Sequence, residues 1–162
     1  MRHQVASSLV LFVWMLAGAP AHAQTPPAQM CRGIGTDDRV RPLPPALVPA
    51  ATGLFHLEAM PSDQVLRTSY FRCDRGAVLV CNVGANLPCG KANTSRHLPA
   101  ADQWCAEHAG SDFIPMYVTG HDTIYRWRCA GAKAAIAATE FKLDRRGFIS
   151  QFWKRVDRPS PP

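Results

Sequence analysis

The stretch that decides the fold is residues 70–81, which read YFRCDRGAVLVC. Its aromatic and β-branched residues indicate two strands, 70–73 and 77–81, and the intervening Asp74-Arg75-Gly76 indicates a three-residue hairpin turn with glycine at the left-handed position. Counting outward from this turn pairs Cys73 with Ala77, Phe71 with Leu79 and Ser69 with Cys81. Because side chains alternate along a strand, the predicted core face carries Phe71, Cys73, Leu79 and Cys81.

Residues 124–136, IYRWRCAGAKAAI, repeat this order of residue types. A strand over 124–129, a turn at Ala130-Gly131 and a small aliphatic strand over 132–136 predict a second antiparallel hairpin. Two hairpins make about four strands, which become stable when a helix covers them.

The covering helix is predicted over residues 99–108. Pro99 suits the first helical turn, Asp102 complements the positive helix end, and Gly110 supplies the stop. Helical spacing places four side chains on the face expected to point toward the sheet: Ala101, Trp104, Cys105 and His108. A disulfide between Cys105 and Cys129 is therefore the preferred pairing.

Three further elements have weaker signals. Short helices are predicted over residues 50–57 and 61–68, each introduced by a proline. The turn-forming residues 144–147 predict a hairpin-like turn between 141–143 and 148–153. We therefore predict an α+β fold, a small disulfide-stapled domain of antiparallel β-hairpins with one or two short covering helices.

The N-terminal segment has the pattern of a signal peptide. Arg2 is followed by 11 consecutive apolar residues, Leu9 to Ala19, and by a small-residue cleavage pattern that ends at Ala23. A membrane anchor needs about 20 apolar residues, and Ala19 stands where a lipoprotein needs its cysteine. The expected segments are a signal peptide over 1–23, a proline-rich extended lead segment over 24–48, a single domain over 49–156 and a disordered tail over 157–162.

All six cysteines follow the predicted signal peptide: Cys31, Cys73, Cys81, Cys89, Cys105 and Cys129. An even number in an exported chain is typical of disulfides, so we expect up to three bridges, with the remaining connectivity open. No two cysteines have C-x-x-C spacing and no H-x-x-x-H accompanies them, so neither a zinc site nor another cofactor is expected.

The charge is modest and scattered. Loss of Arg2 with the signal peptide leaves 17 basic and 12 acidic residues, a net charge of +5. This balance favours anionic surfaces, but the scatter gives no reason to expect nucleic-acid binding. We expect a monomer without a membrane span.

The loop over residues 82–96 carries the first group of candidate binding residues. It is long and polar, and donors for a carbonyl, hydroxyl or acidic group are offered by Asn86, Lys91, Asn93 and Arg96. The alternative is that its Asn and Gly residues only satisfy turn geometry.

The second group surrounds the start of the second hairpin. His121 beside Asp122 has the residue types of a base oriented by a carboxylate, but adjacent side chains of an extended segment point to opposite faces, and Asp122 is expected to form an Asx-type turn. Tyr125 and Trp127 are expected either in the core or as an exposed platform for a glycan or protein. No catalytic residue is assigned.

Residues 81–96 (CNVGANLPCGKANTSR) and 112–129 (DFIPMYVTGHDTIYRWRC) resemble those of a group of uncharacterised exported proteobacterial proteins. The aromatic-x-Cys and glycine turn of residues 70–76 resembles periplasmic lysozyme inhibitors of the MliC type. The first resemblance implies a bacterial, periplasmic setting. The second implies a small exported β-rich domain.

We therefore expect a periplasmic or secreted, non-enzymatic binding or inhibitor-like module. Its partner is expected to be an envelope or extracellular protein or a glycan. The alternative is a small extracytoplasmic hydrolase that uses His121 with a nearby acid, which exchange of His121 for alanine would distinguish.

Overall fold

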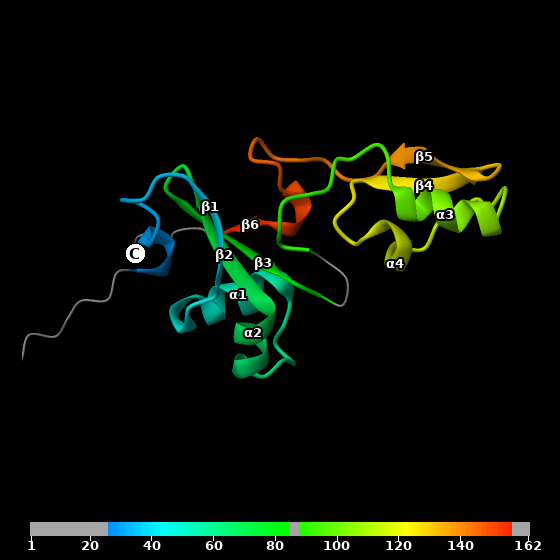
Figure 1. Ribbon diagram of the computed structural model, residues 1–162. Coiled ribbons are helices and arrows are strands. Elements are labelled where there is room, and N and C mark those ends of the chain that lie inside the picture. The colour runs from blue at the N-terminus through cyan, green and yellow to red at the C-terminus, as the bar shows by residue number, and fades with distance from the viewer. Residues whose placement is uncertain (1–25, 85–87, 157–162) are drawn as a thin grey trace, which may run out of the picture.

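The computed structural model describes residues 26–84 and 88–156. These residues form two antiparallel sheets, each accompanied by helices (Figure 1). One sheet has four strands in the order β1-β2-β3-β6, and the other has two, β4 and β5. The predicted α+β class is confirmed. The predicted signal peptide and tail lie outside the described residues.

The strands are β1 (Asp37–Pro42), β2 (Ser69–Asp74), β3 (Ala77–Asn82), β4 (Tyr125–Ala130), β5 (Lys133–Thr139) and β6 (Lys154–Arg155). The α-helices are α1 (Val48–Phe55), α2 (Ser62–Thr68), α3 (Pro99–Glu107) and α4 (Met116–Thr119), and short 3-10 helices lie at Pro27–Gln29, Pro45–Leu47 and Ser150–Phe152. Within the two described ranges, no helix combines the length and apolar character needed to cross a bilayer.

The predicted register of the β2–β3 hairpin is wrong by one residue. The turn contains only Arg75 and Gly76, so Ala77 pairs with Asp74 rather than with Cys73. Both turn residues have left-handed φ angles, 51° and 75°, as a two-residue hairpin turn of this kind requires. A one-residue shift moves side chains to the opposite face. Phe71 and Cys73 therefore share a face with Val78 and Val80, whereas Leu79 and Cys81 lie on the other face.

Both faces of the four-stranded sheet are covered. Val78 and Val80 belong to a core cluster that also contains Ala51 of α1 and Val65 of α2. On the opposite face, Cys81 belongs to a second cluster with aromatic residues from the C-terminal segment: Phe148, Phe152 and Trp153. The sheet is therefore the middle layer between helices α1 and α2 and the C-terminal segment.

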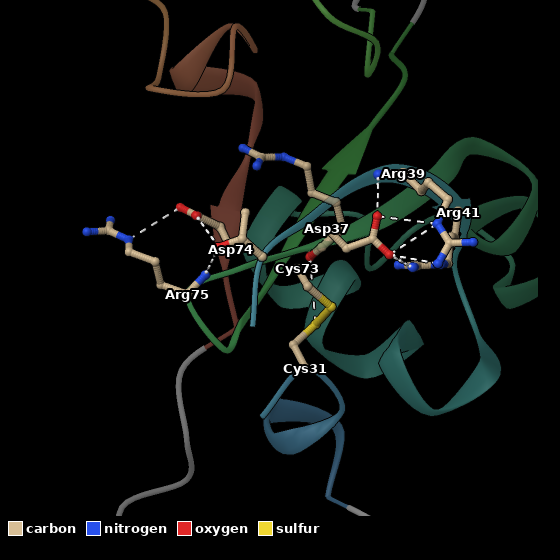
Figure 2. The surroundings of a disulfide bond; sticks show 9 residues. Cys31, Asp37, Arg39, Arg41, Cys73, Asp74 and Arg75 are labelled. Carbon is tan, nitrogen blue, oxygen red and sulfur yellow. Dashed lines mark hydrogen bonds and ion pairs between the residues drawn. A yellow bond between two sulfur atoms is a disulfide. The ribbon is translucent and has the colours of Figure 1, made fainter. Parts of the chain in front are cut away.

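The predicted lead segment contributes a strand to this sheet. β1 lies at the sheet edge and pairs with β2, a position that tolerates prolines because an edge strand need not donate every N–H. The sequence predicted extended chain here but no strand. A disulfide between Cys31 and Cys73 ties the segment before β1 to β2, as Figure 2 shows.

The other two disulfides hold the loop after β3 and the second sheet. Cys81 and Cys89 bridge the two ends of the segment that follows β3. Cys105 of α3 and Cys129 of β4 form the pair that the sequence analysis preferred. All six cysteines are thus paired, and the prediction of three disulfides is confirmed.

The second sheet is the predicted hairpin with a shifted turn. Ala130 pairs with Lys133, so the turn is Gly131-Ala132 rather than Ala130-Gly131. Gly131 has a positive φ of 63° and occupies the first turn position, whereas the prediction had placed it at the second. α3 covers this hairpin with buried Ala101 and Cys105.

Two other sequence predictions need correction. α1 begins and ends two residues before the predicted range, and it ends where His56 turns left-handed with φ 56°. Trp104 stacks on the exposed His108 at the margin of α3 instead of pointing fully into the core.

The predicted hairpin-like turn at 144–147 is present. The Gly147 N–H donates to the Asp144 carbonyl oxygen, and Leu143 forms an antiparallel bridge with Ile149. Beyond this bridge the chain turns into a 3-10 helix, and β6 pairs with β3.

Candidate functional site

The structure brings the two candidate loops together at Asn93. The Asn93 N–H donates to the carbonyl oxygen of Asp122 at 2.8 Å, and the Ile124 N–H donates to the carbonyl oxygen of Asn93 at 3.3 Å. A parallel bridge pairs Asn93 with Thr123. The side-chain oxygen of Asn93 accepts the Ser95 N–H at 2.9 Å. This contact is the one expected from the alternative in which the Asn residues of the loop satisfy turn geometry.

The contact continues through Arg96 to the aromatic residues of β4. The Arg96 guanidinium carbon lies 5.6 Å from the ring centre of Tyr125, within cation–π range. Tyr125 in turn lies edge to face with Trp127, at 6.0 Å between ring centres. Trp127 is only 3% exposed and its indole N–H donates to the Thr123 hydroxyl at 3.2 Å, so it packs in the core.

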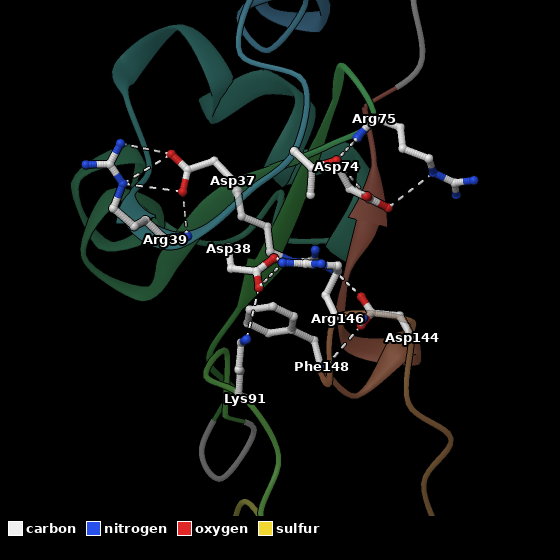
Figure 3. A network of polar contacts seen from close by, with 11 residues as sticks. Asp37, Asp38, Arg39, Asp74, Arg75, Lys91, Asp144, Arg146 and Phe148 are labelled. Carbon is white, nitrogen blue, oxygen red and sulfur yellow. Dashed lines mark hydrogen bonds and ion pairs between the residues drawn. The ribbon is translucent and has the colours of Figure 1, made fainter.

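Lys91 belongs to a different part of the molecule. Its ammonium nitrogen lies 2.9 Å from a carboxylate oxygen of Asp38, which also accepts two hydrogen bonds of 2.8 Å from Arg146 (Figure 3). These two cations lower the pKa of Asp38 to about 2, with the Arg146 hydrogen bond as the larger cause. Lys91 thus joins β1 to the 144–147 turn. Asn86, the remaining candidate of this loop, lies outside the described residues.

A pocket of about 230 Å³ opens beside Tyr125, between α4 and β4. Its apolar walls come from Phe113, Ile114, Met116, Tyr125, Trp127 and Phe141, and its polar lining comes from Thr119, His121, Thr123, Arg126 and Glu140. Mostly apolar walls with a few polar groups are typical of ligand pockets. The sequence analysis had singled out three of these residues: His121, Tyr125 and Trp127.

Exposed apolar side chains lie in and beside this pocket: Phe113 and Met116 line it, and Tyr117 follows Met116 on α4. Four large apolar residues stand out as exposed in the described chain: Ile34 at 50%, Phe113 at 58%, Met116 at 47% and Tyr117 at 80%. Three of the four lie within one five-residue segment, and we call Phe113, Met116 and Tyr117 the apolar ridge. An exposed apolar cluster on a small folded protein commonly marks an interaction site.

The ridge is held by backbone contacts to the edge of β4. The Ile114 N–H donates to the carbonyl oxygen of Trp127 at 3.1 Å, and the Cys129 N–H donates to that of Ser111 at 2.7 Å. Ile114 is buried, whereas the flanking Phe113 and the first two residues of α4, Met116 and Tyr117, are exposed. The sequence analysis missed the ridge, although its signal is present in the run FIPMYV, which contains more apolar residues than so short a segment can bury.

Two charged side chains stand at the rim of the pocket. Arg126 and Glu140 approach each other at 3.5 Å across the pocket rim. Within residues 26–84 and 88–156, no hydrogen bond or ion pair joins His121 to a carboxylate, and no cluster of His, Cys, Asp or Glu has the arrangement of a metal site. The geometry supports binding of an apolar group, with Arg126 and Glu140 available to orient it.

Comparisons with known proteins give no relatives from which to transfer a function. The chain matches no protein-family model, no curated protein and no solved structure. The resemblances drawn from residues 70–76, 81–96 and 112–129 therefore stay predictions.

Proposed function

We propose that this chain is an exported binding protein that captures an apolar side chain of a protein partner in the pocket beside the apolar ridge. The observation that carries this proposal is the position of Phe113 and Met116, exposed in the lining of a pocket walled by Trp127 and Phe141, with the exposed Tyr117 next to Met116 on α4. Their exposure in the isolated chain has a thermodynamic cost that a partner would offset by burying them.

Two properties support a protein partner in an oxidising compartment. Three disulfides are compatible with an extracytoplasmic setting, where such bonds persist. Exposed aromatic and methionine side chains are enriched in protein interfaces, and Tyr117 combines a large apolar ring with a polar tip. The predicted signal peptide over residues 1–23 is consistent with export.

The polar rim explains how the pocket would orient its occupant. Arg126 and Glu140 are both partly exposed, so each keeps hydrogen-bonding capacity toward a partner. Thr123 is buried, and its hydroxyl accepts from both the Tyr125 N–H and the Trp127 indole, which fixes the pocket wall. A preformed wall reduces the ordering cost of binding.

The first experiment places a photo-crosslinking residue at Tyr117 and, as a matched control, at Ile34. Both side chains are large, apolar and exposed, but Ile34 lies before β1 and away from the ridge. We expect a specific crosslinked partner from position 117 in the envelope of the producing cell and none from position 34. Equal crosslinking from both positions would contradict the proposal.

The second experiment measures affinity for the purified partner. Phe113→Ser and Tyr117→Ser should each weaken binding by about thirtyfold, corresponding to about 2 kcal/mol for an aromatic interface anchor, while Ile34→Ser leaves affinity unchanged. His121→Ala should leave most of the affinity intact, because the apolar ridge supplies the contact. An enzymatic turnover that this last substitution abolishes would favour the hydrolase alternative instead.

A further inference from the structure

We propose that the chain has a second site, which binds a phosphate group between the tip of the β2–β3 hairpin and the 144–147 turn. A cavity of about 430 Å³ lies there, and it is lined by Thr36, Asp74, Arg75, Leu143, Asp144, Arg145 and Arg146. It shares no lining residue with the apolar pocket. Its test is therefore independent of the proposed function.

The exposed ionic surface of this cavity is positive. The side chain of Arg75 is 74% exposed and that of Arg146 is 47% exposed. The two carboxylates that line the cavity, those of Asp74 and Asp144, are each only 22% exposed. An approaching ligand therefore meets guanidinium groups first, and the local field favours an anion.

Both carboxylates are already engaged within the protein. Asp144 forms an ion pair with the buried Arg72 and accepts the N–H groups of Arg146 and Phe148 at 2.8 and 3.0 Å. Asp74 accepts the Thr36 hydroxyl at 3.4 Å and lies 3.7 Å from the Arg75 side chain. These contacts shape the two turns and partly neutralise both carboxylates.

Arg145 also lines the cavity, and its side chain is exposed. In the part of the chain that the structure describes, its exposed side chain forms no ion pair and no side-chain hydrogen bond. Arg146 beside it also lines the cavity, and it donates two hydrogen bonds to Asp38 (Figure 3), which fix its guanidinium in place. The cavity thus combines one anchored and one available guanidinium from the same turn.

Arg75 faces the cavity from a backbone conformation that disfavours arginine. Its φ is 51°, in the left-handed region that glycine and asparagine occupy more easily. The turn is held there because the Arg75 N–H donates to the Thr36 hydroxyl at 3.0 Å and the Gly76 N–H donates to the Gly35 carbonyl oxygen at 2.8 Å. These contacts hold the hairpin tip at the cavity, so that the exposed Arg75 side chain lines it.

A phosphomonoester fits this arrangement better than a single carboxylate. Guanidinium groups bind phosphate oxygens in bidentate fashion, and a dianion can engage more than one arginine at a time. Arg75, Arg145 and Arg146 line the cavity from two separate turns, so an anion bound there can meet guanidinium groups from both turns. The phosphate can belong to a soluble phosphorylated saccharide or to a lipid headgroup.

The test titrates the disulfide-intact protein with inorganic phosphate and follows the amide NMR signals of Gly76 and Gly147, one in each turn. We expect saturable shifts of both signals. Arg75→Asn and Arg145→Ala should each weaken binding by about tenfold, the loss expected for one charge-assisted contact. Arg128→Ala, which removes an exposed charge from β4, should change the affinity less than about twofold.

Arg75→Asn also separates lost binding from a damaged fold. Asparagine accepts the left-handed conformation more readily than arginine, so this variant should melt at the same or a higher temperature while it loses phosphate. Absence of saturable shifts in the wild type, or equal weakening by Arg128→Ala, would overturn the site. Competition by glucose phosphate would assign a soluble source, and retention by phosphatidate vesicles that Arg75→Asn abolishes would assign a lipid source.

Discussion

At the scale of single residues, the most unusual feature is the fully buried Arg72. Its guanidinium carbon lies 4.1 Å from the ring centre of Phe148 and 4.7 Å from that of Trp153, and its charge is paired with Asp144. The two rings supply cation–π attraction to the buried guanidinium. Nε and Nη1 of Arg72 have no hydrogen-bond acceptor among the described residues, so the ion pair with Asp144 carries most of the compensation for burial.

This arrangement predicts a strong dependence of stability on Asp144. Asp144→Asn keeps the side-chain oxygen that accepts the Phe148 N–H but removes the charge opposite Arg72, so it should lower the free energy of unfolding by about 3 kcal/mol. The double variant Arg72→Met with Asp144→Asn should recover most of that loss, because no uncompensated charge stays buried. Urea unfolding of all four combinations measures the coupling, and purely additive losses would contradict this interpretation.

The sequence could not have predicted the burial of Arg72. In a strand with Phe71 and Cys73 on the core side, alternation assigns Arg72 to the solvent side. The aromatic residues that cover it, Phe148 and Trp153, lie more than 70 residues further along the chain, at sequence separations that local patterning does not reach. The hairpin was predictable from its residue types, but the second layer over it was not.

At the scale of elements, the short helix α4 and the turn after it position the apolar ridge. Gly120 ends α4 with a φ of 83°, and its N–H donates to the Met116 carbonyl oxygen at 2.8 Å. A Cβ atom at this position would lie 2.8 Å from a carboxylate oxygen of Asp122. The backbone conformation therefore favours glycine here, and an added Cβ would also displace the Asp122 side chain.

Gly120→Ala should accordingly lower the free energy of unfolding by about 1 to 2 kcal/mol and weaken partner binding, because it displaces the end of α4. Gly53→Ala is the matched control. Gly53 is an exposed position of α1 with ordinary φ and nothing within 4 Å of an added Cβ, so alanine should stabilise the protein by about 0.5 to 1 kcal/mol. Thermal unfolding measures both variants. Melting temperatures that shifted in the same direction for Gly120→Ala and Gly53→Ala would contradict this account.

Element types were more predictable than their registers. Alternating residues and glycine turns identified both hairpins, and the proline and acidic start of α3 identified the helix that carries Cys105. The β2–β3 turn was placed one residue off because a hairpin can be closed by two or three residues, and the sequence did not indicate that Arg75 would adopt a positive φ. The β4–β5 turn was placed one residue off because glycine can occupy either position of a two-residue turn. The pocket was predictable only in part, since His121 and Tyr125 were named but the ridge across from them was not.

At the scale of the whole molecule, distant segments are joined by polar contacts as well as by disulfides. Asp38 of β1 receives Lys91 from the loop after Cys89 and Arg146 from the C-terminal turn. These three segments are far apart in sequence, and the sequence analysis assigned Lys91 to ligand binding because nothing local marked Asp38 as its partner. The network closes the four-stranded sheet against the segments that cover it (Figure 3).

The Asp38 network predicts a specific acid sensitivity. The pKa of Asp38 is lowered from 3.8 to about 2 by Arg146 and Lys91, so between these two pH values the unfolded chain binds more protons than the folded one. The stabilisation is therefore complete above pH 4 and is lost as the pH falls toward 2. Melting temperatures measured across this range should fall less steeply for Asp38→Asn than for the wild type.

Asp63→Asn provides the control, because Asp63 pairs with Arg67 on the surface of α2, where both side chains are 67% exposed. The pKa of Asp63 is also lowered, chiefly by the Arg67 hydrogen bond, but an exposed pair within one helix contributes little to stability. Its melting curve should follow the wild type closely throughout the acid range. If Asp38→Asn instead ran parallel to the wild type from pH 5 to pH 2, Asp38 would not be the group that couples these segments to pH.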